Sequence, residues 1–126
     1  NMVSDQPENI LLAELIREQV LIHTREEIPH SVAVKIDKIE EIPVKGTKNL
    51  ENFKTAVLAT VLVERKSQKG ILIGKGGSML KKIGIGARSQ MQTLINGSVY
   101  LELFVKVVPD WRRKPARLSE LGYKDN

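Results

Sequence analysis

The chain begins with a pattern of apolar positions that predicts an amphipathic helix. Over residues 11–22 the apolar side chains recur at steps of three and four, which places them on one face of a helix. Asp5 and Glu8 are typical of a helix start, because such a pair can satisfy the first backbone amides reciprocally. Pro29 disfavours the helical conformation of the residue before it. We therefore expect the first helix to run to about Glu27.

Two strands are predicted next. Over residues 32–37, large apolar side chains alternate with a small or charged one, and the alternation slips near residues 38–39, which indicates a bulge or a strand end. Residues 43–54 combine proline, glycine and asparagine with charge, which predicts a connecting loop that is long for a hairpin. Residues 56–63 are β-branched and apolar on both faces. They predict a strand at the centre of the sheet or covered on both sides.

A glycine cluster separates two further segments with apolar periodicity. Residues 66–73 form a short amphipathic stretch, and residues 74–77 are Gly-Lys-Gly-Gly. Helical spacing then extends over residues 80–94. Gly84 and Gly86 lie inside it, and each lowers helix stability by about 1 kcal/mol relative to alanine. We expect this helix to depend on packing.

The last strand has the clearest alternation in the chain. Asn96 and Gly97 are an expected left-handed helix terminator, and residues 99–107 then alternate with period two. Pro109 ends the strand. Residues 109–126 predict a basic extension with a turn and a short helix.

The predicted order is helix, strand, strand, short helix, helix, strand, short helix. This order predicts an α+β fold in which helices pack on one face of a three-stranded sheet. A length of 126 residues fits a single domain over 1–126, and the 41% hydrophobic and 28% charged content is that of a globular protein. The sequence shows no internal repeat.

Composition excludes several kinds of site. The absence of cysteine removes disulfides, iron-sulfur clusters, thiolate zinc sites and cysteine nucleophiles. His23 and His30 have no partner at metal-ligand spacing, and adjacent glutamates in the chain diverge in direction, so no catalytic dyad is expected. No apolar run approaches the roughly 18 residues of a membrane span. We expect no catalytic residue, no metal and no cofactor in this chain, and no transmembrane segment.

Charge is distributed unevenly along the chain. Residues 1–53 hold ten acidic and six basic side chains, a net of −4, whereas residues 54–126 hold five acidic and fourteen basic ones, a net of +9. Seven positive charges lie between Arg65 and Arg88 without one carboxylate. A polyanion is the expected partner, although a basic face kept for solubility would give the same counts.

The glycine cluster can be compared with three phosphate-binding motifs, of which it fits one. A P-loop needs Gly-Lys-Ser/Thr, but Gly74-Lys75 is followed by Gly76. The dinucleotide fingerprint needs a sixth-position glycine or alanine, but Met79 stands there. The Gly-x-x-Gly loop of KH domains, which joins two helices and clamps about four nucleotides, does fit. A tight interhelical turn remains the alternative, but the cluster lies in the carboxylate-free basic stretch and between the second and third strands, which is the type II KH arrangement.

Three segments carry a resemblance to a known family. SDQPENILLAELIREQVLIHTREEIPHSVAV, LVERKSQKGILIGKGGSMLKKIG and YLELFVKVVPDWRR resemble the C-terminal type II KH domain of the Era GTPase family. The resemblance implies single-stranded RNA binding near the 3′ end of small-subunit (16S) ribosomal RNA, in assembly of the small ribosomal subunit. It also implies a GTPase domain of the same parent protein as a partner, and a cytoplasmic location with peripheral association at the inner membrane. This chain contains no P-loop, so we do not expect it to be an enzyme.

The resemblance and the charge pattern together give a set of candidate RNA-binding residues. In this interpretation we expect the glycine amides to approach the RNA backbone, lysines to neutralise phosphates and rim a groove, and aliphatic residues, with Val61 or Val63, to form its floor. As alternatives, each of the aliphatic residues belongs to the buried core, Ser78 caps a helix, Met79 fills a core gap and Trp111 packs over the sheet end. The candidates are Lys69, Ile71, Ile73, Gly74, Lys75, Gly76, Gly77, Ser78, Met79, Lys81, Lys82, Trp111, Arg112 and Arg113.

A different function class remains open at this point. The same fold could dock on the ribosome or on a partner domain without contacting RNA, and the acidic N-terminal half could provide that surface. A steep loss of affinity with salt would indicate an RNA clamp, whereas a packed protein interface would respond only mildly.

Overall fold

A computed structural model describes residues 7–24, 28, 32–44 and 53–109 of the chain. Within these ranges the helices and strands follow one another in the predicted order, and the segment over 66–73 is helical. The short helix predicted within residues 109–126 lies outside the described part of the chain. None of the helices in these ranges is both long and apolar enough to cross a bilayer. The elements are α1 (Pro7–Thr24), β1 (Val32–Pro43), β2 (Phe53–Val63), α2 (Lys66–Ile73), the 3-10 turn η2 (Lys75–Gly77), α3 (Ser78–Ile95) and β3 (Val99–Val107).

The three strands form one mixed sheet in the order β1-β2-β3. β1 and β2 pair antiparallel, with Val34 opposite Val61, whereas β2 and β3 run parallel, with Val61 opposite Val105. Residues 56–63 lie in the central strand, which is one of the two placements predicted for them, but β2 begins earlier, at Phe53, inside the predicted loop. The register shifts between Ile36 and Lys38, so the slip in alternation marks a bulge and β1 continues past it.

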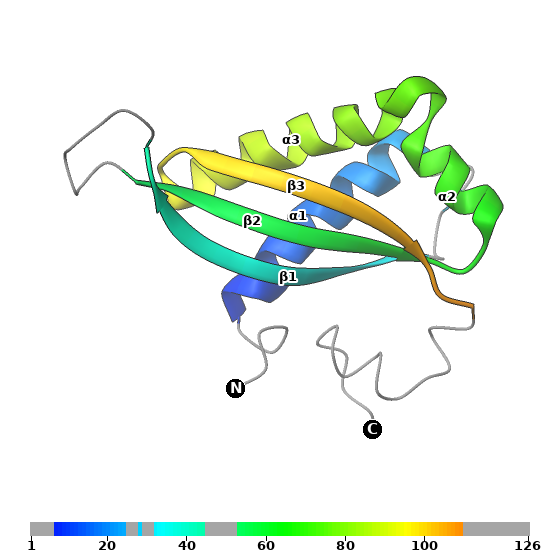
Figure 1. Ribbon diagram of the computed structural model, residues 1–126, viewed down its shortest axis with the longest axis horizontal. Coiled ribbons are helices and arrows are strands. Elements are labelled where there is room, and N and C mark those ends of the chain that lie inside the picture. Colours follow the sequence, from blue (N-terminus) through cyan, green and yellow to red (C-terminus); the bar gives the residue numbers. More distant parts are fainter. Residues whose placement is uncertain (1–6, 25–27, 29–31, 45–52, 110–126) are drawn as a thin grey trace.

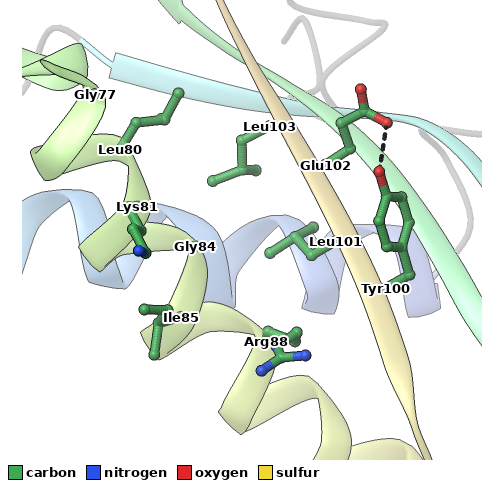
Figure 2. Close-up of a pocket in the computed structure, with 10 residues that line it drawn as sticks. All are labelled: Gly77, Leu80, Lys81, Gly84, Ile85, Arg88, Tyr100, Leu101, Glu102 and Leu103. Carbon is green, nitrogen blue, oxygen red and sulfur yellow. Dashed lines mark hydrogen bonds between the residues drawn. The ribbon is translucent and has the colours of Figure 1, made fainter.

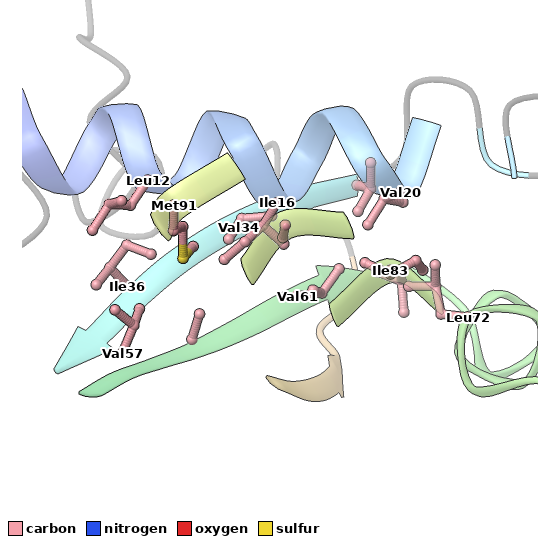
Figure 3. Packing of buried hydrophobic residues seen from close by; sticks show 14 of the residues in the cluster. Leu12, Ile16, Val20, Val34, Ile36, Val57, Val61, Leu72, Ile83 and Met91 are labelled. Atoms are coloured by element: carbon pink, nitrogen blue, oxygen red, sulfur yellow. The ribbon is translucent and has the colours of Figure 1, made fainter. Parts of the chain in front are cut away.

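Helices cover one face of this sheet, as Figure 1 shows for α1 and α3. The core lies between the helices and the sheet, where Ile16 of α1, Ile83 of α3 and Val61 of β2 are fully buried (Figure 3). Leu72 closes the core from α2. The predicted α+β class, with helices on one face of a three-stranded sheet, is therefore confirmed.

The helix ends follow local chemistry. The side-chain Oε1 of Gln68 accepts hydrogen bonds from the backbone N–H groups of Glu64 and Arg65, each at 3.0 Å, and so holds the start of α2. Asn96 adopts the left-handed conformation, with φ 60°, and ends α3 as predicted.

Gly86 explains how α3 can lie close to α1. A Cβ atom at this position would overlap the side chain of Gln19, which is buried between the two helices. A side chain here would force Gln19 to move. The glycine costs helix propensity, but it permits the close packing on which α3 depends.

Candidate nucleic-acid interface

The loop between α2 and α3 is built from three glycines with positive φ. The φ angles are 73° at Gly74, 63° at Gly76 and 81° at Gly77, which L side chains rarely adopt. The N–H of Gly74 donates to the carbonyl of Gly70 at 2.9 Å, and the N–H of Gly77 donates to the carbonyl of Gly74 at 3.2 Å. These bonds reverse the chain tightly between the two helices, as the predicted interhelical loop requires.

Position 74 needs a glycine both because of its backbone conformation and because a side chain there would clash with Met79. Its φ of 73° with ψ of 176° lies in a region that only glycine adopts readily. A Cβ atom would stand 2.7 Å from the Cβ and 2.8 Å from the backbone nitrogen of Met79, neither of which can move away easily. The first glycine of the motif is thus fixed by the fold itself.

We therefore expect Gly74→Ala to lower the free energy of unfolding by about 3 kcal/mol. Gly77→Ala is the matched control, because its φ of 81° is also positive but nothing lies within 4 Å of an added Cβ. Its cost should be about 1–2 kcal/mol. Urea unfolding of both variants measures the difference, and equal costs would show that the contact with Met79 is unimportant.

The tip of the loop is open to solvent. Lys75 and Gly76 are both exposed, and nothing lies within 4 Å of a Cβ built at Gly76. A ligand backbone can therefore approach the Gly76 peptide closely. The Lys75 ammonium lies beside it on the chain and can supply a positive charge.

A groove of about 440 Å³ runs between α3 and β3 and begins at the loop, where Gly77 lines it. Figure 2 shows Leu101 and Leu103 of β3 pointing toward α3, and Gly84 of α3 lying opposite them without a side chain. A Cβ at Gly84 would stand 3.7 Å from Cδ1 of Leu103. The missing side chain keeps the groove open. The other lining residues are Leu80, Lys81, Ile85, Arg88, Tyr100 and Glu102.

The groove combines an apolar floor with a basic rim. Lys81 and Arg88 are exposed on α3, and both line the groove (Figure 2). Ile85 is 55% exposed, which is unusual for an isoleucine and leaves an apolar contact surface beside the charges. Among the described residues that line it, Glu102 alone carries a carboxylate.

Tyr100 and Glu102 form a pair on the outer side of β3. The Tyr100 hydroxyl donates a hydrogen bond to Oε1 of Glu102 at 3.1 Å. This bond and the negative charge of Glu102 raise the pKa of Tyr100 above its ordinary value. Tyr100 is 46% exposed.

The sequence pattern of the KH domain family matches residues 27–112. The chain belongs to the KH domain family. Within that family, it corresponds to the KH domain of Era GTPases, as the resemblance implied, because proteins of that name match almost the whole chain.

The relatives of this KH domain are longer proteins. GTPase Era of Nostoc sp. (strain PCC 7120) is 61% identical over 98% of the chain, and GTPase Era of Synechocystis sp. is 54% identical over the same share. The chain spans about 36% of the length of each of them.

Solved structures agree with the sequence relatives. A variant of Era from Aquifex aeolicus bound to GDP and aluminium fluoride superimposes with a TM-score of 0.81 at 43% identity, over 94% of this chain and 38% of that one. A crystal structure of Era in complex with MgGDPNP and nucleotides 1506–1542 of 16S ribosomal RNA superimposes with a TM-score of 0.82 at 43% identity. The match covers 94% of this chain and 37% of that one.

The predicted site residues of the KH domain do not all face the groove. Val61 and Val63 are fully buried in the core, so the prediction that one of them forms the groove floor is wrong. They point to the helix-covered face of the central strand and are sealed there. Ile71 and Met79 are partly buried and pack against the core, which agrees with a gap-filling role for Met79. Ile73 is half-buried.

The other candidates are exposed or lie outside the described residues. Lys69, Lys81 and Lys82 are exposed, and of these Lys81 lines the groove. Ser78 is exposed at the start of α3, but the residue that caps this helix is Gly77, without a side-chain hydrogen bond. The remaining candidates, Trp111, Arg112 and Arg113, fall outside the part of the chain that the structure describes.

The sequence reasoning missed most of the groove. It placed Leu80 only within the helical spacing of residues 80–94 and treated Gly84 only as a helix weakness. It counted Arg88 among the basic residues without placing it in a site, and it gave no role to Tyr100. One available signal was Ile85, an isoleucine off the apolar stripe of residues 80–94. No group of three or more metal-ligating side chains is placed to hold an ion within the described ranges.

Proposed function

We propose that this KH domain binds single-stranded RNA, with the backbone at the Gly-x-x-Gly loop and the bases in the groove between α3 and β3. The observation that carries the proposal is the continuity of the two features: Gly77 belongs to the loop and lines the groove. A strand of RNA held by its phosphates at the loop therefore enters a basic, apolar-floored channel directly.

The loop contributes backbone contacts and charge. Because Gly76 carries no Cβ, a phosphate can approach its peptide group, and Lys75 neutralises the phosphate charge. The N-terminus of the 18-residue helix α3 lies immediately after the loop and adds a favourable dipole for an anion. These contacts are independent of base sequence, so they set the position of the strand.

The groove contributes contacts to unpaired bases. Leu101, Leu103 and the exposed Ile85 present an apolar surface for the faces of splayed bases, while Lys81 and Arg88 lie at the rim for their phosphates or edges. Paired bases stay stacked inside a helix and cannot lie in such a channel. Single strands should be preferred over duplexes.

The RNA target that we propose is the 3′ region of small-subunit ribosomal RNA. The support is the similarity to Era, which has been solved with nucleotides 1506–1542 of 16S ribosomal RNA. The chain would then act in the cytoplasm as the RNA-binding part of an Era-like GTPase, together with a GTPase domain of the same parent protein, during assembly of the small ribosomal subunit.

Fluorescence anisotropy with a labelled single strand from the 3′ end of 16S ribosomal RNA tests this proposal, with the same strand in a perfect duplex as the control. With about three to five phosphates neutralised, log K should fall against log salt with a slope of about −2 to −3.5. A flat salt response, or equal affinity for the duplex, would favour a protein-docking domain instead.

A further inference from the structure

A second groove, of about 470 Å³, lies on a different part of the domain. It is formed by the first turns of α1 and the last turn of α3, over β1 and β2 past the bulge. Its floor includes Leu12, which is almost fully buried, and the half-buried Ile39. The other lining residues are Glu8, Leu11, Glu40, Glu41, Thr55, Leu94 and Ile95.

Large apolar side chains are exposed along this groove. Leu11 is 47% exposed and Leu94 is 51% exposed, and Ile95 adds a third aliphatic chain. Phe53 is exposed two residues before the lining residue Thr55, so its side chain lies on the same face of β2. Single exposed leucines are ordinary, but a contiguous group around a hollow is typical of a binding surface.

The charge of the second groove is opposite to that of the first. Three carboxylates line it, from Glu8, Glu40 and Glu41, and the described lining residues include no lysine or arginine. Lys38 pairs with Glu40 at 3.5 Å, but both side chains are largely exposed and the pair is weak. The surface is therefore apolar and negatively charged, and its negative charge repels RNA.

We propose that this acidic groove docks an amphipathic, basic segment of a partner protein. Apolar side chains of the segment would enter between Leu11 and Leu94, and its lysines or arginines would lie against Glu8 and Glu41. Charge complementarity selects this occupant: an acidic segment or a nucleic acid would meet repulsion along the rim. The two grooves use different residues, so the domain can hold RNA and protein at once. This inference does not rest on the proposed RNA function.

A designed peptide provides the probe. The peptide is an amphipathic helix of about 14 residues, four turns, with leucines on one face and lysines elsewhere, and its counterpart has glutamates in place of the lysines. Amide chemical shifts of the isotopically labelled chain, followed on titration, should change saturably at Leu11, Glu41 and Leu94 with the basic peptide. The acidic peptide should bind at least tenfold more weakly.

Charge reversal in the groove makes the test specific. The double variant Glu40→Lys, Glu41→Lys should bind the basic peptide about tenfold more weakly and the acidic peptide more tightly than the parent does. Leu94→Ser should weaken both peptides several-fold. Ile22→Ser is the matched control, because Ile22 is 58% exposed on α1 and does not line the groove. RNA affinity should stay within about twofold for Leu94→Ser and Ile22→Ser, which leave the net charge unchanged.

Three outcomes would overturn the proposal. Shift changes away from the groove would show that the peptide binds elsewhere on the domain. Equal affinity for the two peptides in the parent chain would show that the groove has no charge preference. Concentration-dependent dimerisation in sedimentation, abolished by Leu94→Ser, would show that a second copy of the chain covers the groove instead of a basic partner.

Discussion

The double variant Lys75→Asp, Gly76→Asp is expected to lose measurable RNA binding while the domain stays folded. One favourable charge beside the phosphates becomes two repulsive ones, and a Cβ and a carboxylate enter the space that the RNA backbone needs at Gly76. Loss of a single phosphate contact would give only a modest, salt-dependent weakening. Complete loss would therefore point to close backbone approach at the loop.

The stability cost of this double variant should be small. Gly76 has φ 63°, which aspartate tolerates better than most residues, and nothing lies within 4 Å of its Cβ position. We expect a loss of about 1 kcal/mol in the free energy of unfolding, and an unchanged fold by circular dichroism.

A matched control separates the loop from net charge. The variant Lys54→Asp, Asn96→Asp makes the same change in charge and also places an aspartate in a left-handed position, since Asn96 has φ 60°. Both residues lie outside the loop and outside the lining of the RNA groove. Anisotropy titrations should show near-parental RNA affinity for this control. Parental affinity in the loop variant, with an unchanged melting temperature, would contradict the Gly-x-x-Gly clamp.

Filling the groove at Gly84 should also block RNA binding, and the effect should grow with side-chain size. Alanine at this position makes an ordinary contact with Leu103 at 3.7 Å, whereas leucine would extend into the 440 Å³ groove between α3 and β3. We expect about a twofold loss of RNA affinity for Gly84→Ala and at least tenfold for Gly84→Leu. Stability should be unchanged or higher by up to about 1 kcal/mol, because glycine is the poorest helix former after proline.

The control for this series is Ser89→Leu, which adds the same side chain to α3 at an exposed position that does not line the groove. Anisotropy and thermal melting of the variants should show affinity falling only in the Gly84 series while stability holds. Equal RNA affinity for Gly84→Leu and the parent would mean that bases do not lie in this groove.

The elements of the fold were largely predictable because their signals are local. The period-two run predicted the bounds of β3 at residues 99–107, and Asn96 predicted the end of α3. The break in alternation near residues 38–39 predicted the bulge of β1. The glycine loop was also local, since three positive-φ positions and the basic charges around them all lie in a short stretch of sequence.

The groove was not predictable in the same way, because it depends on pairing between distant segments. β3 pairs parallel to β2 at the sheet edge, and this places Leu101 and Leu103 opposite α3. No periodicity in either segment carries that information. The same reason explains the error at Val61 and Val63: apolar positions of a central strand look alike in sequence, whether a helix or a ligand covers them.

Mapping the RNA on the chain by amide chemical shifts tests the central claim most directly. On titration with a short single strand from the 3′ end of 16S ribosomal RNA, we expect saturable changes over residues 74–77, at Gly84 and Arg88 of α3, and at Leu101 and Leu103 of β3. The acidic groove should not respond. Changes confined to the acidic groove or the outer sheet face, with the loop unaffected, would contradict the account.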